Sequence, residues 1–136
     1  MKIIDIPKTD KTPEVILDDD KFFFQIKGNC LPENIREFSG RVLGNLDEFM
    51  RNLSTKDFRS GKAPVFRINF RLGYFNSAAA KFLVDILMIS GNYAKEGSNI
   101  KVYWYFEEDD HDMLEAGEEI SQMVDIPMEF ITVVKE

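Results

Sequence analysis

The turn at residues 74–77 has the residue types of a modification site. Asn76 and Ser77 follow an alternating strand pattern and precede an apolar helical pattern, so Asn76 is expected to cap a helix that Ser77 begins. A helix N-terminus presents unpaired backbone N–H groups and a partial positive charge, which favour an anion. A phosphate on Ser77 would add about −1.5 to −2 charges there. Ser77 is therefore a candidate phosphorylation site, and helix capping alone is the alternative role.

Residues 107–112 are the densest group of potential metal ligands, with carboxylates around His111. They lack the ligand spacing and central glycine of a helix–loop–helix calcium site. His111 is the only histidine, so no His–His metal pair can form, and no obvious Ser–His–Asp triad is built around it. Acidic residues suit a helix start, so we expect a solvated helix entry with no metal and no other cofactor. The alternative is a small metal- or ligand-binding domain that uses this cluster.

Three further groups have simple structural interpretations. Cys30 is the only cysteine and has no identifiable base beside it, so it is interpreted as a structural thiol. The aspartates at 18–20 are typical of a hairpin turn, although they could be mistaken for a metal site. The aromatics at 103–106 could stack nucleobases, but their density in one strand favours core packing.

The elements that position these residues follow from hydrophobic periodicity. After an N-terminal arm that contains Pro7 and Pro13, period-two or continuous apolar patterns predict strands. Apolar residues at spacings of three and four predict helices that begin near Pro32, after Asn76 and after residue 112. Breaks are expected at residues 60–64 and 97–99. The predicted strands are 15–17, 22–27, 65–72, 100–106 and 128–134.

This order predicts an α/β fold: a single-layer, mixed, mostly parallel sheet of about five strands, flanked by three helices. The nearly continuous apolar run at 100–106 predicts an interior strand covered on both faces. The spacing of Gly40 and Gly44 in the first helix could admit a close neighbour. At 136 residues, the chain is expected to form one domain over 1–136.

Composition limits the classes of partner. The net charge is −7, which opposes a nucleic-acid or anionic-membrane surface and suits a protein partner. The first ten residues lack the apolar core of a secretory signal, and no apolar stretch can span a bilayer, so a cytoplasmic location is expected. We expect a protein-binding regulator and not an enzyme.

Several segments together resemble the SiaC family of bacterial regulatory phosphoproteins. They are residues 28–34, 74–77, 104–105 and 112–118, which occur in the family's order and span nearly the whole chain. The resemblance implies a fold like that of STAS-type anti-sigma-factor antagonists. It also implies partner-switching by a serine/threonine kinase and a PP2C-type phosphatase. The unphosphorylated form would bind and activate an effector such as a diguanylate cyclase.

The resemblance also implies the site residues. The family's phosphoacceptor threonine corresponds to Ser77, while Ala78 and Ala79 replace the two serines that follow it in the family. Cys30 and Leu31 replace a serine and a tyrosine in the family's loop. The expected partner-binding residues are Asn29, Leu31, Pro32, Glu33, Asn34, Tyr74 and Asn76. Besides the metal-binding domain, an assembly subunit without any switch is the other alternative.

Overall fold

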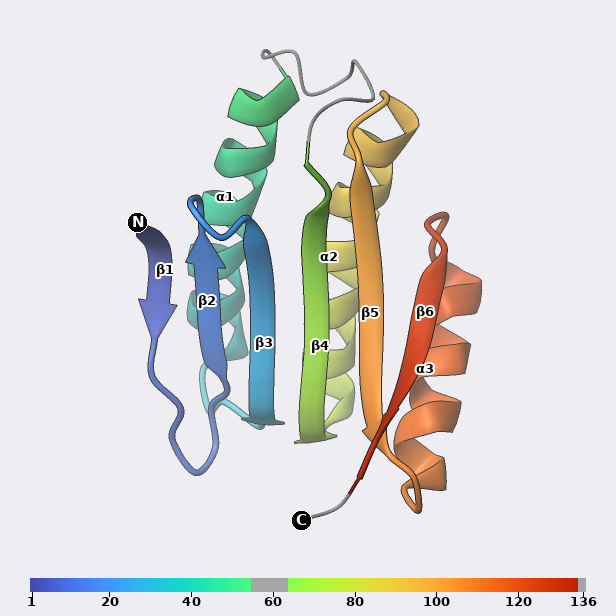
Figure 1. Cartoon of the computed structure of the whole chain (residues 1–136). Helices are drawn as coiled ribbons and strands as arrows, with labels where there is room; N and C mark the ends of the chain where they lie inside the picture. Colours follow the sequence, from blue (N-terminus) through green and yellow to red (C-terminus); the bar gives the residue numbers. More distant parts are fainter. Residues whose placement is uncertain (55–63, 135–136) are drawn as a thin grey trace.

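The computed structural model describes residues 1–54 and 64–134, and within them the chain forms a single mixed sheet with helices on it (Figure 1). The order of the strands in the sheet is their order in the chain, β1 to β6. β1, β2 and β3 are antiparallel neighbours, and β3 to β6 are parallel. The strands are β1 Lys2–Ile6, β2 Glu14–Asp18, β3 Phe23–Cys30, β4 Phe66–Phe75, β5 Ile100–Glu107 and β6 Met128–Val133. The helices are α1 Ile35–Ser54, α2 Ser77–Lys95 and α3 His111–Met123.

The predicted fold class is confirmed, with six strands in place of about five. The additional strand is β1, which lies in the segment interpreted as an arm. It is a five-residue edge strand that pairs only with β2 and carries a register shift between Lys2 and Ile4. Its pattern is short and irregular, and Pro7 ends it, so the periodicity did not indicate a strand.

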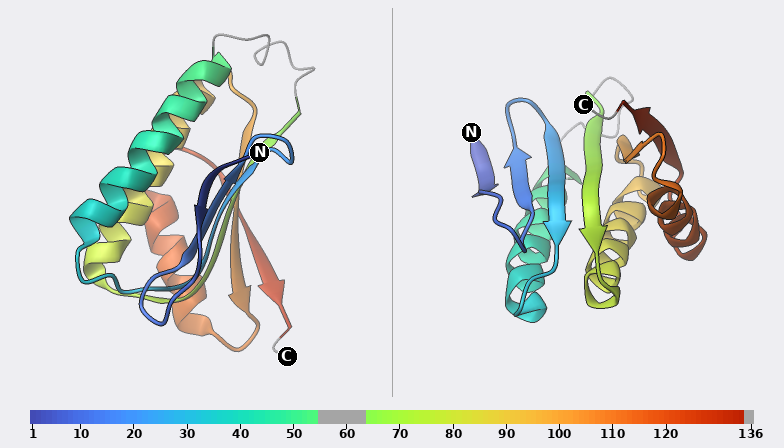
Figure 2. Two further views of the ribbon diagram at one scale, coloured as in Figure 1. Left: turned by 90° about the vertical axis from the view of Figure 1, so that its left-hand side faces the viewer. Right: turned by 90° about the horizontal axis from the view of Figure 1, so that it is seen from below.

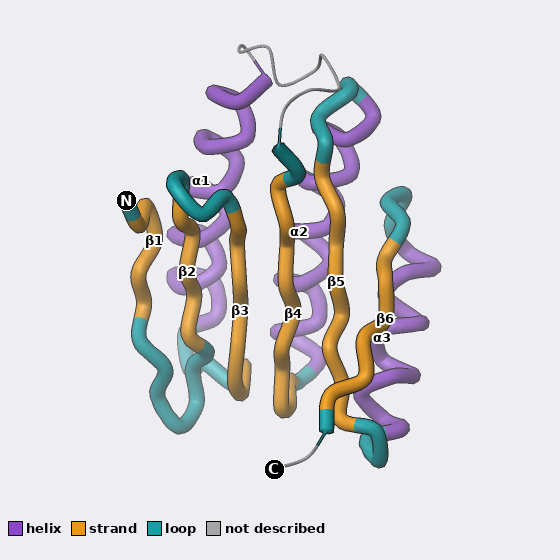
Figure 3. Tube along the Cα trace, viewed as in Figure 1, coloured by secondary structure: helices purple, strands orange, loops and turns teal. Residues whose placement is uncertain are grey.

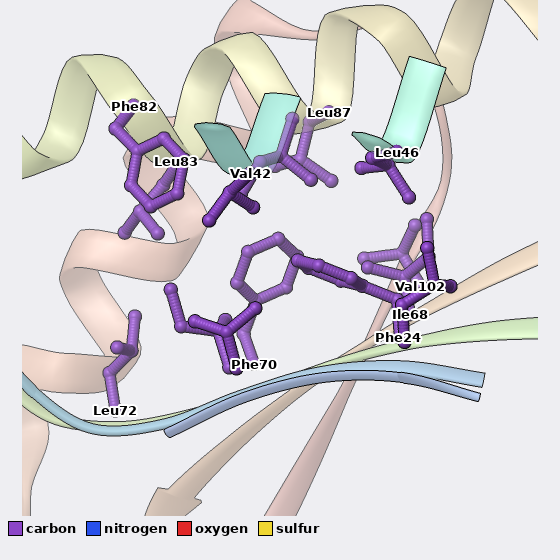
Figure 4. Close-up of a cluster of buried hydrophobic side chains, with 14 of the residues drawn as sticks. Phe24, Val42, Leu46, Ile68, Phe70, Leu72, Phe82, Leu83, Leu87 and Val102 are labelled. Atoms are coloured by element: carbon purple, nitrogen blue, oxygen red, sulfur yellow. The ribbon is translucent and has the colours of Figure 1, made fainter. Parts of the chain in front are cut away.

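All the described helices lie on one face of the sheet (Figures 1 and 2). Between this face and α1 and α2 lies a continuous apolar core, in which strand and helix side chains interdigitate (Figure 4). The largest fully buried side chains include Phe24, Phe66, Phe70, Phe82 and Trp104. Within the described ranges, no helix covers the other face.

The prediction that residues 100–106 are covered on both faces is therefore wrong. β5 is an interior strand between β4 and β6, but only Val102 and Trp104 are buried on the helix side. Tyr103 and Tyr105 are half-buried on the uncovered face. A tyrosine ring has an apolar body and a polar hydroxyl, so it tolerates partial exposure. A run of aromatic residues therefore does not show which face of a strand is exposed to solvent.

The first helix begins three residues later than predicted. Asn34 caps it, because its Oδ1 accepts a hydrogen bond from the N–H of Glu37 at 3.2 Å. Pro32 and Glu33 lie in the preceding loop. The predicted break at residues 60–63 lies outside the described residues. The stop after the second helix is confirmed, since α2 ends at Lys95 and a loop separates it from β5 (Figure 3).

Two glycine positions in the helices have opposite surroundings. A Cβ at Gly117 would lie 2.5 Å from Nε1 of Trp104, so α3 can approach β5 only because this residue is glycine. The Trp104 indole then donates a hydrogen bond to the carbonyl of Met113 at 3.0 Å. A Cβ at Gly40 or Gly44 would meet nothing within 4 Å. The close approach considered for that pair is therefore absent in the described residues.

None of the helices in the described residues combines the length and the apolar character that crossing a membrane requires.

Candidate functional site

The N-terminus of α2 is built as the sequence predicts. Asn76 adopts an extended conformation (φ −93°, ψ 176°) directly after β4, and its side-chain oxygen accepts a hydrogen bond from the N–H of Ala79 at 2.9 Å. The carbonyl of Asn76 accepts the first helical bond, from the N–H of Ala80, at 2.9 Å. Ser77 is then the first helical residue. This cap fixes the backbone of Ser77 at the positive end of the helix dipole.

Ser77 is exposed, as are its neighbours Asn76 and Ala78. The first turn of α2 contains no acidic side chain, unlike the first turns of α1 and α3, which hold Glu37 and Asp112. Ala79, in contrast, is fully buried and anchors the turn in the core. The positive end of α2 is therefore left uncompensated by any side chain of its own first turn, which favours an added phosphate.

The end of β3 lies beside the turn at 74–77. Asn29 pairs with Tyr74 and Cys30 with Phe75, after a register shift at Gly28, which adopts φ +113°. The Oδ1 of Asn29 would lie 2.8 Å from a Cβ at position 73, so Gly73 admits the Asn29 side chain against β4. Tyr74 is 59% exposed, which places a large aromatic surface next to this strand end.

The loop that follows β3 is held by contacts with residue 11. The N–H of Leu31 donates to the carbonyl of Lys11 at 2.6 Å, and the Lys11 ammonium lies 3.4 Å from Oε1 of Glu33. Pro32, Glu33 and Asn34 line a shallow cleft of about 230 Å³ on the surface next to α1. The sequence-predicted loop residues thus share one surface, with Leu31 and Pro32 half-buried and Glu33 and Asn34 exposed.

A groove of about 260 Å³ separates the first turns of α1 and α2. Phe82 lines this groove and packs edge-to-face against Phe38, with ring centroids 5.8 Å apart. Ala78, next to Ser77, lines this groove together with Arg36 and Lys81. Lys81 pairs with Asp85 at 3.0 Å. Sequence reasoning missed the α1 contribution, because periodicity identifies a helix face but not which helix will lie beside it.

We call the surface formed by the 74–77 turn, the 29–34 loop and this groove the switch surface. The parallel strands β3 and β4 end at the same edge of the sheet, and α1 and α2 both begin there (Figure 1). This common edge brings together all the residues expected from the sequence. Their arrangement provides an exposed hydroxyl, an uncompensated helix end and a contoured surface around it.

The other candidate residues have structural contacts in the described part of the chain. Asp110 caps α3, since its Oδ1 accepts from the N–H of Met113 at 3.0 Å, as expected for a helix entry. Cys30 is fully buried, and desolvation raises the pKa of its thiol to about 11. A thiol with such a pKa is not a nucleophile at neutral pH.

The aspartates at 18–20 form the predicted turn. Asp18 Oδ1 accepts from the N–H groups of Asp20 and Lys21 at 2.9 and 3.0 Å, and these bonds lower its pKa. The three carboxylates could also hold a metal ion by their spacing. The ammonium of Met1 lies among them instead, 2.8 Å from Asp19 and in direct contact with Asp20.

One family model matches nearly the whole chain. The family model described as "SiaC family regulatory phosphoprotein" matches residues 6–133. An uncharacterized protein of Pseudomonas aeruginosa strain UCBPP-PA14, PA14_02130, is 24% identical over 127 residues, which cover 93% of this chain and 94% of that protein.

Solved structures from the same organism share the fold. Apo-SiaC of P. aeruginosa superposes with a TM-score of 0.80 at 22% identity, covering 96% of this chain and 98% of that one. The structure of the diguanylate cyclase SiaD in complex with its activator SiaC matches with a TM-score of 0.83 at 22% identity, covering 96% and 99%.

Proposed function

Because this chain belongs to the SiaC family of regulatory phosphoproteins, we propose that it is a phosphorylation-switched binding protein and that Ser77 is its switch. In this proposal the unphosphorylated form binds and activates an effector such as a diguanylate cyclase, as the activator SiaC is described to do for SiaD. The chain acts as one regulatory domain over residues 1–136, in the cytoplasm, without catalysis of its own.

The observation that carries the proposal is the exposed Ser77 hydroxyl at the start of α2. A kinase needs an accessible hydroxyl, and Ser77 is exposed while its neighbour Ala79 is buried. Ser77 is also the one hydroxyl of the 76–79 turn, because alanines follow it. A serine/threonine kinase and a PP2C-type phosphatase would therefore act on a single oxygen atom in this turn. Each molecule would have only two states there, modified or unmodified.

A phosphate at this position would act in two ways. It would be favoured by the uncompensated end of α2 and by Arg36 and Lys81, which line the adjacent groove. It would also place about −1.5 to −2 charges on the switch surface, beside the groove that Ala78 lines, where an effector would otherwise pack. The first effect stabilises the modified protein, and the second weakens the complex by repulsion and desolvation.

The test is a calorimetric titration of the chain's diguanylate cyclase effector with three variants. Ser77→Ala should bind like the wild type, and Ser77→Asp should bind at least about tenfold more weakly, equivalent to about 1.4 kcal/mol. Ser121→Asp, on the distant helix α3, is the matched control and should bind like the wild type. Equal affinities for all variants would rule out Ser77 as the switch.

Modification itself is tested on protein purified from its native cells. Intact-mass spectrometry should show a species heavier by about 80 Da, the mass of a phosphoryl group, and peptide mapping should place it on Ser77. Treatment with a PP2C-type phosphatase should remove it. A phosphoryl group that maps to another residue would contradict the assignment.

A further inference from the structure

The face of the sheet that no described helix covers carries a group of basic side chains. Lys27 on β3, Arg67 and Arg71 on β4, and Lys101 on β5 are all exposed. We call these four residues the basic stripe. They stand out because the chain as a whole has a net charge of −7.

The strand register brings the stripe together. Lys27 is the Cα partner of Arg71, and Arg67 is the partner of Lys101. Partners on adjacent strands lie about 4.8 Å apart, and residues 67 and 71 lie about 13 Å apart along β4. The stripe therefore extends over three strands and consists of two rows, Lys27 with Arg71 and Arg67 with Lys101.

Like charges directly opposite each other on adjacent strands destabilise a sheet. Among residues 1–54 and 64–134, no cation of the stripe has a carboxylate oxygen within 4.0 Å; the ion pairs form elsewhere. Carboxylates flank the stripe on three strands: Glu14 on β2 is the Cα partner of Lys27, Glu129 on β6 is the partner of Tyr103, and Glu107 at the end of β5 lines a cleft with Lys27 and Arg71. In the described residues, the fold thus keeps four cations in two rows with carboxylates nearby but none in ion-pair contact with them.

The stripe is partly preorganised. The Arg71 guanidinium lies over the ring of Tyr105, 4.4 Å from its centroid, which fixes this side chain at little entropic cost. A cleft of about 370 Å³ adjoins it, lined by Lys8, Lys27, Arg71 and Tyr105 among others. Between the two arginines along β4, Oδ1 of Asn69 is covered and accepts no hydrogen bond in the described residues.

We propose that the basic stripe is a docking surface for an acidic segment of a partner protein, bound in extended conformation along β4. In an extended chain, residues two positions apart are about 6.7 Å apart, and residues four positions apart are therefore about 13 Å apart. This distance matches the separation of Arg67 and Arg71, so carboxylates four positions apart could each face one arginine. Arginine forks bind carboxylates in bidentate pairs. The acidic residues on β2 and β6 bound the stripe on both sides, so its width suits one polypeptide and repels a bilayer or a duplex.

This surface lies on the face of the sheet opposite to α1 and α2 (Figure 2), and it meets the switch surface at the end of β3, where Asn29 lines the cleft. It therefore provides a second site on the same chain. A partner could stay docked there while Ser77 is modified and demodified.

The probe for the test is a fluorescein-labelled decapeptide of alternating Glu and Ser, with a decapeptide of alternating Gln and Ser as the neutral counterpart. Fluorescence anisotropy at low salt should show at least about tenfold tighter binding of the acidic peptide. The double variant Arg67→Glu/Arg71→Glu should lose this preference. The matched control Lys2→Glu/Lys21→Glu makes the same charge change on exposed residues outside the stripe and should retain it.

NMR chemical-shift mapping on the wild type distinguishes the site. On addition of the acidic peptide, chemical-shift perturbations should fall on β3, β4 and β5 around the stripe. The double variant Arg67→Gln/Arg71→Gln is the fold control: its spectrum should match that of the wild type outside the stripe. Three results would overturn the proposal: equal binding of both peptides, equal loss in both charge-reversal variants, or stronger competition by ATP or by phosphatidylglycerol vesicles than by unlabelled acidic peptide. None of these results would bear on Ser77.

Discussion

Single residues in this protein owe their chemistry to their degree of exposure. Cys30 and Ser77 both lie next to strand ends at the same edge of the sheet, and each offers a potential nucleophile or acceptor atom. Burial raises the pKa of the Cys30 thiol to about 11, whereas the Ser77 hydroxyl is exposed. The buried atom is thereby kept inert, and the exposed one is available to an enzyme.

The thiol of Cys30 should resist alkylation in the folded protein. A rise of its pKa from 9.0 to about 11 lowers the thiolate fraction about a hundredfold at neutral pH, and burial slows access further. Iodoacetamide labelling followed by mass spectrometry should be slow for the native protein and rapid in urea. Gln122→Cys, at an exposed position of α3, supplies the fast-reacting native control.

The same shift sets a pH dependence of stability. Because the folded pKa of Cys30 exceeds the unfolded value, the free energy of unfolding is unaffected by this group below about pH 9 and falls as the pH rises from 9 towards 11. Replacement by Ala should remove this part of the alkaline loss, measured by urea titrations at several pH values. An unchanged alkaline slope in Cys30→Ala would contradict the assignment.

At the scale of elements, the contacts of α3 and α1 make opposite predictions for glycine substitution. Gly117→Ala should lower the free energy of unfolding by about 1–3 kcal/mol, because the new methyl group overlaps the rigid Trp104 ring. Gly44→Ala should raise it by about 0.5–1 kcal/mol, because the site is open and alanine favours the helix. Urea denaturation measures both, and a stabilising Gly117→Ala would mean that α3 does not pack this closely.

The sequence predicted most elements, and its failures have physical causes. Local periodicity and capping chemistry define α2 and the Asn76 cap, so the main part of the switch surface was predictable. β1 was missed because an edge strand needs only one partner and a weak pattern. The uncovered face of β5 and the position of α1 beside Ala78 depend on which layers pack together, and this information is not local to any segment.

At the scale of the whole molecule, a single sheet with one helical layer forms one continuous core. The core contains Trp104, the only tryptophan, fully buried between the sheet and α3. Its fluorescence therefore reports on tertiary packing at α3, while far-UV circular dichroism reports on all the helices together.

We expect the two signals to change together. In urea, Trp104 fluorescence and circular dichroism should give coincident transitions with one midpoint, as for a two-state domain of this size. Two separate midpoints would mean that α3 and the β5–β6 end unfold independently of the rest. The Trp104→Phe variant, followed by circular dichroism alone, checks that the probe does not itself set the midpoint.

The match between strand order and chain order has a consequence for synthesis on the ribosome. Each strand finds its partner in the strand made just before it, so the sheet can extend in the direction of translation from the β1–β2–β3 meander onwards. No strand has to wait for a distant segment or insert between two that are already joined. Until β6 emerges, β5 is the unpaired edge of the growing sheet. A chaperone that binds a stalled nascent chain would therefore meet the aromatic side chains of β5.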